Sequence, residues 1–237
     1  MTDLFISSIR MANSVDYTEY PYTLPVIQQL NNLNLKENVT FLVGENGIGK
    51  STILEAVAVN YGFNPEGGSK NFNFSTKATH SGLHQHLVLS KGTKYPQDGF
   101  FLRAESFYNL ATEIERISLG NAYGGKSLHE QSHGESFIAL MLNRFRGNGL
   151  YLLDEPEAAL SPSRQMAVLS IIDDLVKNNS QFIIATHSPI LLAYPRAEIY
   201  VLTEAGISLT PYKETEHYLI TKSFLNNPER MLKYLCD

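Results

Sequence analysis

The chain has 237 residues, of which 43% are hydrophobic and 11% aromatic, a size and composition typical of one globular domain with a substantial core. Its 24 acidic and 19 basic side chains give a net charge of −5, which excludes a uniformly basic nucleic-acid-binding surface and leaves only a local patch open. The single cysteine, Cys236, excludes an internal disulfide, and no apolar stretch approaches the roughly 20 residues of a membrane span. We therefore expect a soluble, cytoplasmic protein without a signal peptide.

The first half of the chain alternates strand and helix patterns. In chain order it predicts a strand at 4–11, a short helix at 26–33 and a buried β-branched strand at 39–43. A helix at 51–62, an exposed strand at 82–90 and a further strand at 100–107 follow. A Tyr- and Pro-rich segment follows the first strand, and a glycine-rich loop stands between the buried strand and its helix. The pattern is weakest in residues 62–97.

The second half alternates more regularly. It predicts a helix at 135–145, a strand at 149–154, a helix at 163–178 and a strand at 181–186. A hairpin at 198–212 and a final helix at 228–235, after the Asn-Asn-Pro break, follow. Strands alternating with helices predict an α/β fold, in which a mostly parallel sheet carries helices on both faces and a small antiparallel portion is added. We expect one domain over 1–237, with an elaboration at 62–130 and a C-terminal hairpin and helix at 198–237.

The stretch GENGIGKS fits the phosphate-loop (Walker A) pattern G-x-x-x-x-G-K-[ST], and it stands between a predicted strand and a predicted helix. Glycines let such a loop wrap around phosphates, so that its backbone amides and the following helix N-terminus face the oxygens. Lysine would reach the β- and γ-phosphates, and the serine hydroxyl would ligate Mg²⁺. The residues predicted to bind ATP here are Gly44, Glu45, Asn46, Gly47, Ile48, Gly49, Lys50, Ser51 and Thr52.

Two adjacent acids end the apolar strand LYLLDEPE, a Walker B pattern. The carboxyl end of a parallel strand lies at the same edge of the sheet as the phosphate loop. Asp154 is therefore predicted to hold Mg²⁺ together with Ser51, and Glu155 to activate the attacking water. Glu157 is the weaker candidate, placed to favour the N-terminus of the next helix.

His187 follows the next buried strand, QFIIAT, and so belongs to the same edge. An imidazole there can donate a hydrogen bond to a γ-phosphate oxygen or to the attacking water. We predict that His187 senses the nucleotide state.

The stretch EQSHGESF contains a serine, a histidine and a glutamate around one glycine, as a hydrolase site would. It also opens a predicted helix 20 residues before Asp154, which favours a phosphate-binding turn. In that interpretation Ser132 is a ligand and not a nucleophile, and Gly134 allows a backbone amide to approach an oxyanion.

The ordered set GENGIGKS, SHGE, LLDEPEAALS and ATHS, spanning residues 39–189, resembles the ATP-binding-cassette (ABC) ATPase superfamily of P-loop NTPases. The resemblance implies that Ser132, His133, Gly134 and Glu135 form the signature, with Gly-Glu endings as in the non-transporter branch. It places Ala158, Ala159, Leu160 and Ser161 on the D-loop. It also implies an ATP-dependent head-to-tail homodimer in which each signature contacts the ATP held by the other chain's phosphate loop.

The chain departs from that family pattern at several positions. Gln131 replaces the leading leucine and His133 the first glycine of the signature, and Ser161 stands where transporters usually have aspartate. No glutamine follows FFLRA at the Q-loop position, where Glu105 and Ser106 are nearest. Tyr20 and Tyr22 are the candidates for stacking on adenine, although tyrosines in Pro-rich loops more often pack.

Two roles remain open. Only 27 residues separate Ala104 from Ser132, too few for the helical subdomain of transporter cassettes, and no coiled-coil heptads are present. The chain thus resembles the compact RecF/SMC-like group of bacterial AAA-type ATPases, and a role with DNA or a nuclease partner in repair, maintenance or phage defence is expected. The alternative is the energising subunit of a membrane transporter. Segment 66–98 carries four lysines and three histidines, for which a solvated strand is favoured over a phosphate-contacting edge or a metal site.

Overall fold

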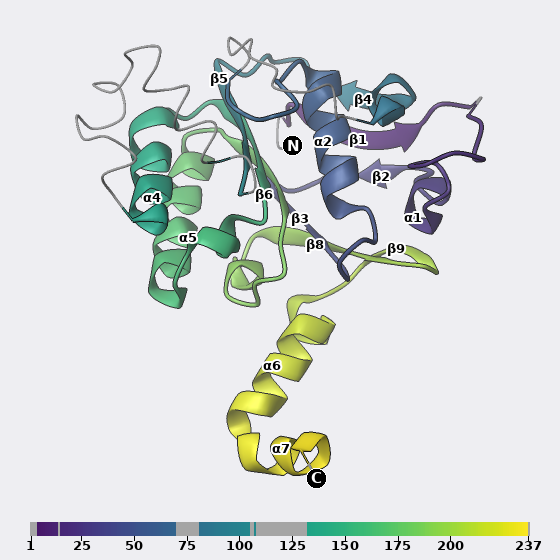
Figure 1. Ribbon diagram of the computed structural model, residues 1–237. Helices are drawn as coiled ribbons and strands as arrows, with labels where there is room; N and C mark the ends of the chain where they lie inside the picture. Colours follow the sequence, from purple (N-terminus) through teal and green to yellow (C-terminus); the bar gives the residue numbers. More distant parts are fainter. Residues whose placement is uncertain (1–3, 14, 70–80, 105–106, 108–131, 237) are drawn as a thin grey trace.

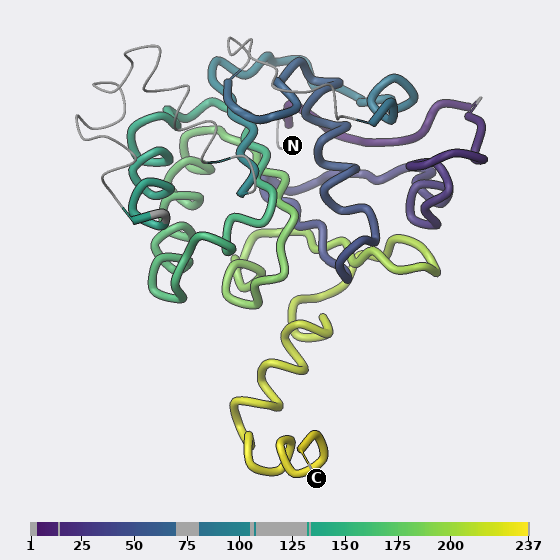
Figure 2. The backbone as a smooth tube through the Cα atoms, in the orientation of Figure 1, coloured from purple at the N-terminus to yellow at the C-terminus, as the bar shows by residue number. Residues whose placement is uncertain are grey.

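The computed structural model describes residues 4–13, 15–69, 81–104, 107 and 132–236. Figure 1 gives the elements and Figure 2 the course of the backbone, in which a body of sheets and helices is followed by a C-terminal extension.

A six-stranded sheet forms the centre of the body. Its order is β5-β6-β7-β3-β8-β9, with every neighbouring pair parallel except β8 and β9. The strands are β3 (Val39–Val43), β5 (Asp98–Arg103), β6 (Gly149–Asp154), β7 (Gln181–Ala185), β8 (Ala197–Thr203) and β9 (Gly206–Leu209). Strands β3, β6 and β7 are buried along their whole length, as expected of parallel strands covered on both faces.

A smaller antiparallel sheet has the order β2-β1-β4. It comprises β1 (Ile6–Met11), β2 (Leu33–Asn34) and β4 (Leu87–Lys91). The predicted α/β fold with a mostly parallel sheet and a small antiparallel portion is therefore confirmed.

The helices lie on the two faces of the central sheet (Figure 1). One face carries α1 (Pro25–Gln28) and α2 (Lys50–Tyr61), and the other carries α4 (His133–Arg144) and α5 (Pro162–Lys177). Because side chains alternate along a strand, Phe41 joins the core with α4 and α5, whereas Leu42 joins the core with α2. Four short 3₁₀ helices complete the described body, at Gly82–Gln85, Pro156–Ala159, Leu191–Ala193 and Tyr212–Glu214.

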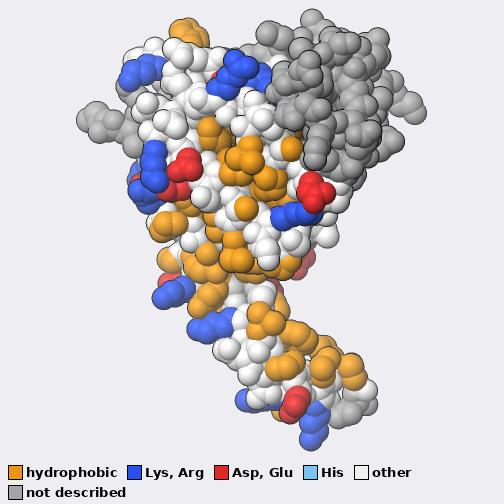
Figure 3. Space-filling model, turned by 90° about the vertical axis from the view of Figure 1, so that its left-hand side faces the viewer, with side chains coloured by type: hydrophobic (Ala, Val, Ile, Leu, Met, Phe, Trp, Pro, Cys, Tyr) orange, Lys and Arg blue, Asp and Glu red, His pale blue; other side chains and the backbone are white. Residues whose placement is uncertain are grey.

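The C-terminal extension consists of α6 (Glu216–Asn226) and α7 (Pro228–Cys236). It carries exposed hydrophobic side chains, which Figure 3 shows along its surface: Leu219, Ile220, Leu225, Leu232 and Leu235. None of the described helices is both long and apolar enough to cross a bilayer.

The boundaries correct several sequence predictions. The short helix expected at 26–33 ends at Gln28 and is followed by strand β2, and the strand expected at 100–107 runs from Asp98 to Arg103. The tail was expected to be helical only after the Asn-Asn-Pro break, but α6 precedes that break, since Thr215 caps it by accepting a hydrogen bond from Tyr218 N at 3.4 Å. The exposed strand expected at 82–90 begins only at Leu87, because residues 82–85 form a 3₁₀ turn. The hairpin expected at 198–212 is present as β8 and β9.

Candidate active site

The phosphate loop connects β3 to α2, as its sequence predicts. The loop reaches the helix through Gly49, whose φ of +112° lies in the left-handed region that side chains rarely adopt. A cavity of about 430 Å³ lies against Gly44–Ile48, and it is also lined by Leu24, by residues 201–204 at the end of β8 and by His217 of α6. The loop therefore borders a cavity large enough for part of a nucleotide.

Lys50 is folded back onto its own loop. Its Nζ donates hydrogen bonds to the backbone oxygens of Gly44 and Glu45, both at 2.9 Å, and only 4% of the residue is exposed. Burial lowers the pKa of Lys50, and the carboxylates of Glu155, Asp154 and Glu157 act in the opposite direction. The ammonium thus lies in the loop with two carbonyl partners that phosphate oxygens could replace.

Ser51 and Asp154 meet at the first turn of α2. The Ser51 hydroxyl donates to Asp154 Oδ1 at 2.8 Å, and Asp154 is 5% exposed at the end of β6. A hydroxyl and a carboxylate oxygen this close are suited to Mg²⁺, which prefers oxygen ligands and keeps several waters and phosphate oxygens as its others. The pair predicted to hold the metal is brought together.

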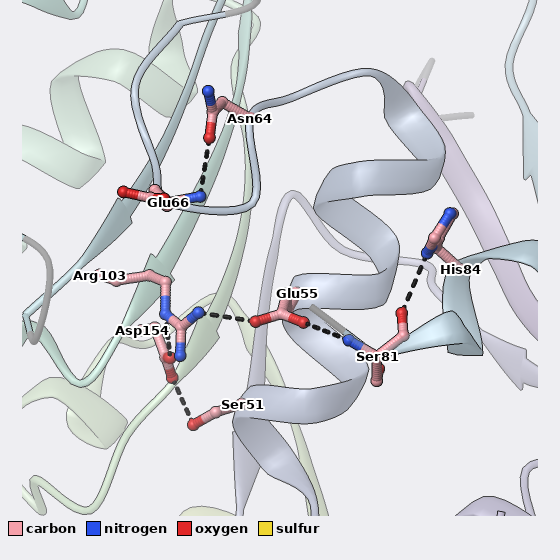
Figure 4. Close-up of polar contacts among 8 residues, drawn as sticks. All are labelled: Ser51, Glu55, Asn64, Glu66, Ser81, His84, Arg103 and Asp154. Atoms are coloured by element: carbon pink, nitrogen blue, oxygen red, sulfur yellow. Dashed lines mark hydrogen bonds and ion pairs between the residues drawn. The ribbon is translucent and has the colours of Figure 1, made fainter. Parts of the chain in front are cut away.

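Arg103, at the end of β5, adds a cation beside this pair (Figure 4). Its Nε lies 3.6 Å from Asp154 Oδ2, and its Nη1 donates to Glu55 Oε2 of α2 at 2.6 Å. The three side chains are between 7% and 20% exposed. Arg103 therefore ties the helix that follows the phosphate loop to the strand end that carries Asp154.

Replacing Arg103 by methionine is expected to destabilise the nucleotide-free protein by about 2 kcal/mol, because two poorly exposed carboxylates lose their cation. Denaturant unfolding measures this loss, and adding Glu55→Gln should recover part of it. The control is Arg196→Met, which removes a more exposed arginine paired with Asp173 and should lower stability much less. An equal loss of unfolding free energy in the two arginine variants would contradict a stabilising link from Arg103 to Glu55 and Asp154.

Glu155 turns the chain sharply at the end of β6. Its φ of +49° is left-handed, its amide donates to Ala185 O of β7 at 2.9 Å, and its side chain is 41% exposed. Glu155 Oε1 lies 3.7 Å from His187 Nε2, which is an ion-pair distance and too long for a hydrogen bond. The carboxylate is thus accessible and unshielded by a close partner, as a general base requires.

Glu157 makes a contact that the sequence did not predict. Its Oε1 accepts a hydrogen bond from the backbone amide of His187, and burial raises its pKa. Glu157 therefore connects the loop after β6 to the loop after β7, and it does not serve mainly to favour the N-terminus of α5. The carboxylate oxygen Oε2 of Glu157 is buried, whereas 41% of the Glu155 side chain is exposed.

His187 follows β7 and faces the same edge of the sheet as Glu155. Its Nε2 is buried and has no hydrogen-bond partner in the described part of the chain. Burial lowers the pKa of His187, the Lys50 charge lowers it further, and Glu155 opposes them. A neutral imidazole that carries its proton on Nε2 can donate a hydrogen bond to a phosphate oxygen.

The signature residues begin α4. Ser132 N and Oγ both donate to Glu135 Oε2, at 3.0 and 2.7 Å, which forms a capping box and lowers the pKa of Glu135. Arg164 of α5 donates to Ser132 Oγ at 3.2 Å and pairs with Glu135 Oε1 at 3.0 Å. Ser132 and Glu135 are exposed, as surface ligands for a second chain would be, and Gln131 lies outside the described residues.

Gly134 has a packing role that the sequence did not indicate. A Cβ at this position would lie 2.7 Å from the backbone oxygen of Ala159, in the predicted D-loop. The glycine is therefore needed for the close contact between α4 and the segment before α5, whatever its amide does for a ligand. His133 is the first residue of α4.

Other predicted residues lie away from the site or outside the described chain. Tyr22 donates to or accepts from His86 Nδ1 at 2.8 Å, and Tyr20 is 70% exposed; neither lines the cavity beside the phosphate loop. Glu105 and Ser106, the nearest residues to a Q-loop, are outside the described residues. Within the described part of segment 66–98, Lys91 lies over the Tyr61 ring, and no cluster that could hold a metal is found among the described residues.

Sequence reasoning missed three side chains at this edge. Arg103 could have been found from its place at a strand end, just before the position at which a Q-loop glutamine was expected. Glu55 and His217 belong to helices, and no motif signals them. His217 Nε2 lies 3.1 Å from His187 Nδ1.

Two family models match parts of the chain. One, described as "AAA domain, putative AbiEii toxin, Type IV TA system", matches residues 127–193, and another, described as "AAA domain", matches residues 24–118. The nucleoside import ATP-binding protein NupA of Lactococcus lactis is 26% identical over 66% of this chain, which spans 35% of the length of NupA. Protein McbF of Escherichia coli is 23% identical over 95% of this chain and 94% of its own length.

A solved structure extends the comparison to the fold. cbiO1 from Clostridium perfringens, part of the ABC transporter complex cbiONQ, superimposes with a TM-score of 0.52 at 20% identity, over 98% of this chain and all of its own. The likeness to this structure extends over the sheet and the elements that carry the phosphate loop and the Ser51–Asp154 pair. The chain has the α/β fold of ABC ATPases.

Proposed function

We propose that the chain binds ATP with Mg²⁺ and hydrolyses it in a head-to-tail homodimer that closes around two nucleotides. The observation that carries the proposal is the meeting of three strand ends at one edge: the loop after β3 with Lys50, Asp154 and Glu155 after β6, and His187 after β7. Such a carboxyl edge is where open α/β sheets bind ligands. Glu157 and Arg103 hold neighbouring parts of this edge together.

The mechanism assigns one task to each side chain. Lys50 binds the β- and γ-phosphates after leaving its two loop carbonyls, and Ser51 and Asp154 hold the metal. Glu155 accepts the proton of the attacking water, and His187 donates its Nε2–H to a γ-phosphate oxygen. When bound, Mg²⁺ neutralises charge on the phosphates and orients them.

Closure by a second copy is supported by where the signature lies. The cavities beside the phosphate loop are lined by the loop, β8 and α6, and residues 132–135 do not line them. Ser132 and Glu135 are exposed at the start of α4, a helix that lies on the opposite face of the sheet from α2 (Figure 1). A signature serving the ATP of another chain would then complete the site, its helix start stabilising charge that develops on the γ-phosphate.

For the biological role, we propose an ATPase of the non-transporter branch that serves DNA maintenance or phage defence, with DNA or a nuclease as partner. The short segment between Ala104 and Ser132 and the Gly-Glu ending of the signature support this role. The partial match to a family model whose description names a toxin–antitoxin system also supports it. Relatives named as import proteins keep the transporter subunit as the alternative.

The role is tested by a DNA mobility shift with the Glu155→Gln variant, which should keep ATP bound. We expect duplex DNA to shift at low salt only when ATP and Mg²⁺ are present, and the shift to weaken steeply with salt because phosphate contacts release counterions. The control is Lys50→Met in the same assay. No shift at low salt, together with ATP-dependent pelleting on membrane vesicles from the producing cells, would favour the transporter alternative instead.

A further inference from the structure

A second histidine lies behind His187. His217 is the second residue of α6, and its Nε2 is 3.1 Å from His187 Nδ1, with the ring centroids 5.3 Å apart. Both side chains line a cavity of about 490 Å³ that also contacts Glu45 and Asn46 of the phosphate loop. The contact therefore connects the C-terminal extension to the side chain predicted to sense the nucleotide.

The start of α6 is anchored to the His187 loop independently of the two rings. The hydroxyl of Tyr212 donates to Pro189 O at 2.9 Å, two residues after His187. Thr215, 1% exposed, donates to Tyr212 O at 2.8 Å and caps α6. The position of His217 is therefore set by the backbone that carries it, and not by the imidazole contact alone.

The protons on the two rings decide what His187 can do. A neutral imidazole has one N–H and one lone pair, so in a contact between two ring nitrogens one must donate and the other accept. If His187 Nδ1 accepts, its proton is on Nε2, which then faces Glu155 Oε1 at 3.7 Å as a donor. If His187 Nδ1 donates, the lone pair of Nε2 faces that carboxylate and the approaching phosphate oxygens, which is repulsive.

The surroundings of the pair keep both rings neutral, so their contact must take one of these two arrangements. Lys50 and Glu155 act on His187, and Lys50, Glu157 and Glu216 act on His217. Burial is the largest influence on both histidines and lowers both pKa values, so both rings are neutral near pH 7. In a neutral pair a single proton bridges the two nitrogens.

We propose that His217 is a positioning residue that donates its Nε2–H to His187 Nδ1 and so holds His187 in the tautomer that carries its proton on Nε2. The Nε2–H of His187 is then already in place as a hydrogen-bond donor when a nucleotide binds and brings its γ-phosphate. Outer partners that fix the tautomer of a metal-ligating histidine typically contribute about 10- to 100-fold to metal affinity or activity, and we expect an effect of similar size here. The tautomer claim concerns the nucleotide-free protein, and its consequence for turnover rests on the proposed ATPase function.

The tautomer is measured by ¹⁵N NMR of the histidine rings of the nucleotide-free protein at about pH 8, where neutral imidazoles prevail. In the wild type we expect the His187 Nε2 to be protonated and its Nδ1 not. His217→Gln, whose amide nitrogen can donate from a similar place, should keep that pattern, and His217→Met should lose it. His86→Gln, which alters a distant histidine paired with Tyr22, is the control and should leave His187 unchanged.

Turnover provides the second readout. His217→Met is expected to lower kcat for ATP about 10-fold with a smaller change in KM, and His217→Gln to restore most of it. A wild-type His187 protonated on Nδ1, or a His217→Met variant with unchanged tautomer and kcat, would overturn the inference. If the NMR pattern is as expected but the wild type hydrolyses no ATP, the proposed function fails while the role of His217 in positioning His187 stands.

Discussion

Replacing Glu155 by glutamine is expected to lower kcat for ATP by about 10²- to 10⁴-fold, the usual contribution of a general base, with ATP affinity nearly unchanged. Glutamine keeps the shape of the side chain but cannot accept the proton of the attacking water. Steady-state hydrolysis and a separate nucleotide-binding titration distinguish the two effects. Turnover equal to that of the wild type would remove Glu155 from the mechanism.

Glu157→Gln is the matched control, because it changes the neighbouring acid of the same motif in the same way. Burial raises the pKa of Glu157, so a neutral amide of the same size should replace it with little loss. Its carbonyl oxygen can still accept from the His187 amide. We expect this variant to keep most of its turnover, and a loss as large as that of Glu155→Gln would mean that the roles of the two acids are not separated by burial.

Lys50→Met is expected to weaken ATP binding by about 100-fold or more. The variant removes the cation that would reach the β- and γ-phosphates, and charge-assisted hydrogen bonds to phosphate are among the strongest in proteins. Titration with a fluorescent ATP analogue in the presence of Mg²⁺ measures the change.

The same variant should remain folded in the absence of nucleotide. Burial lowers the pKa of Lys50, which means that keeping the charged ammonium in the loop has a desolvation cost in the folded protein. Methionine has no such cost, so stability should be kept or slightly raised despite the loss of two hydrogen bonds to Gly44 and Glu45. The control is Lys91→Met, which removes an exposed lysine from Tyr61. Unchanged ATP affinity in Lys50→Met would contradict the assignment of the loop.

The convergence of the main motifs could be predicted because it follows from topology. Parallel strands place their carboxyl ends at one edge, so a phosphate loop, an Asp-Glu pair and a histidine that each follow a buried strand must lie near one another. β3, β6 and β7 are neighbours in the sheet, and the 2.8 Å contact between Ser51 and Asp154 is a direct result.

The supporting side chains could not be predicted in the same way. His217 is 30 residues from His187, and only the packing of α6 against the loop after β7 brings the two rings together. Glu157 follows Glu155 by two residues, yet after the turn at Glu155 one carboxylate oxygen of Glu157 is buried while the Glu155 side chain stays 41% exposed. A motif fixes the residue type but not these neighbours, because they depend on how separate elements pack.

Gly134 has a packing role that its motif does not predict. The family resemblance accounts for the glycine by a ligand, whereas the contact with Ala159 O accounts for it by packing within the chain. The two explanations are compatible, since a helix start held against the D-loop is also a rigid surface for a second copy. The capping box of Ser132 and Glu135 adds to that rigidity.

The claim that two copies close around ATP is tested most directly by the mass of Glu155→Gln in solution, measured by sedimentation with and without ATP and Mg²⁺. Without nucleotide we expect the 26.5 kDa chain, and with saturating ATP twice that mass, because the bound ATP is not consumed. Adding Lys50→Met to the same chain should abolish the shift. A Glu155→Gln variant that binds ATP but keeps the same mass with and without it would contradict closure by a second copy.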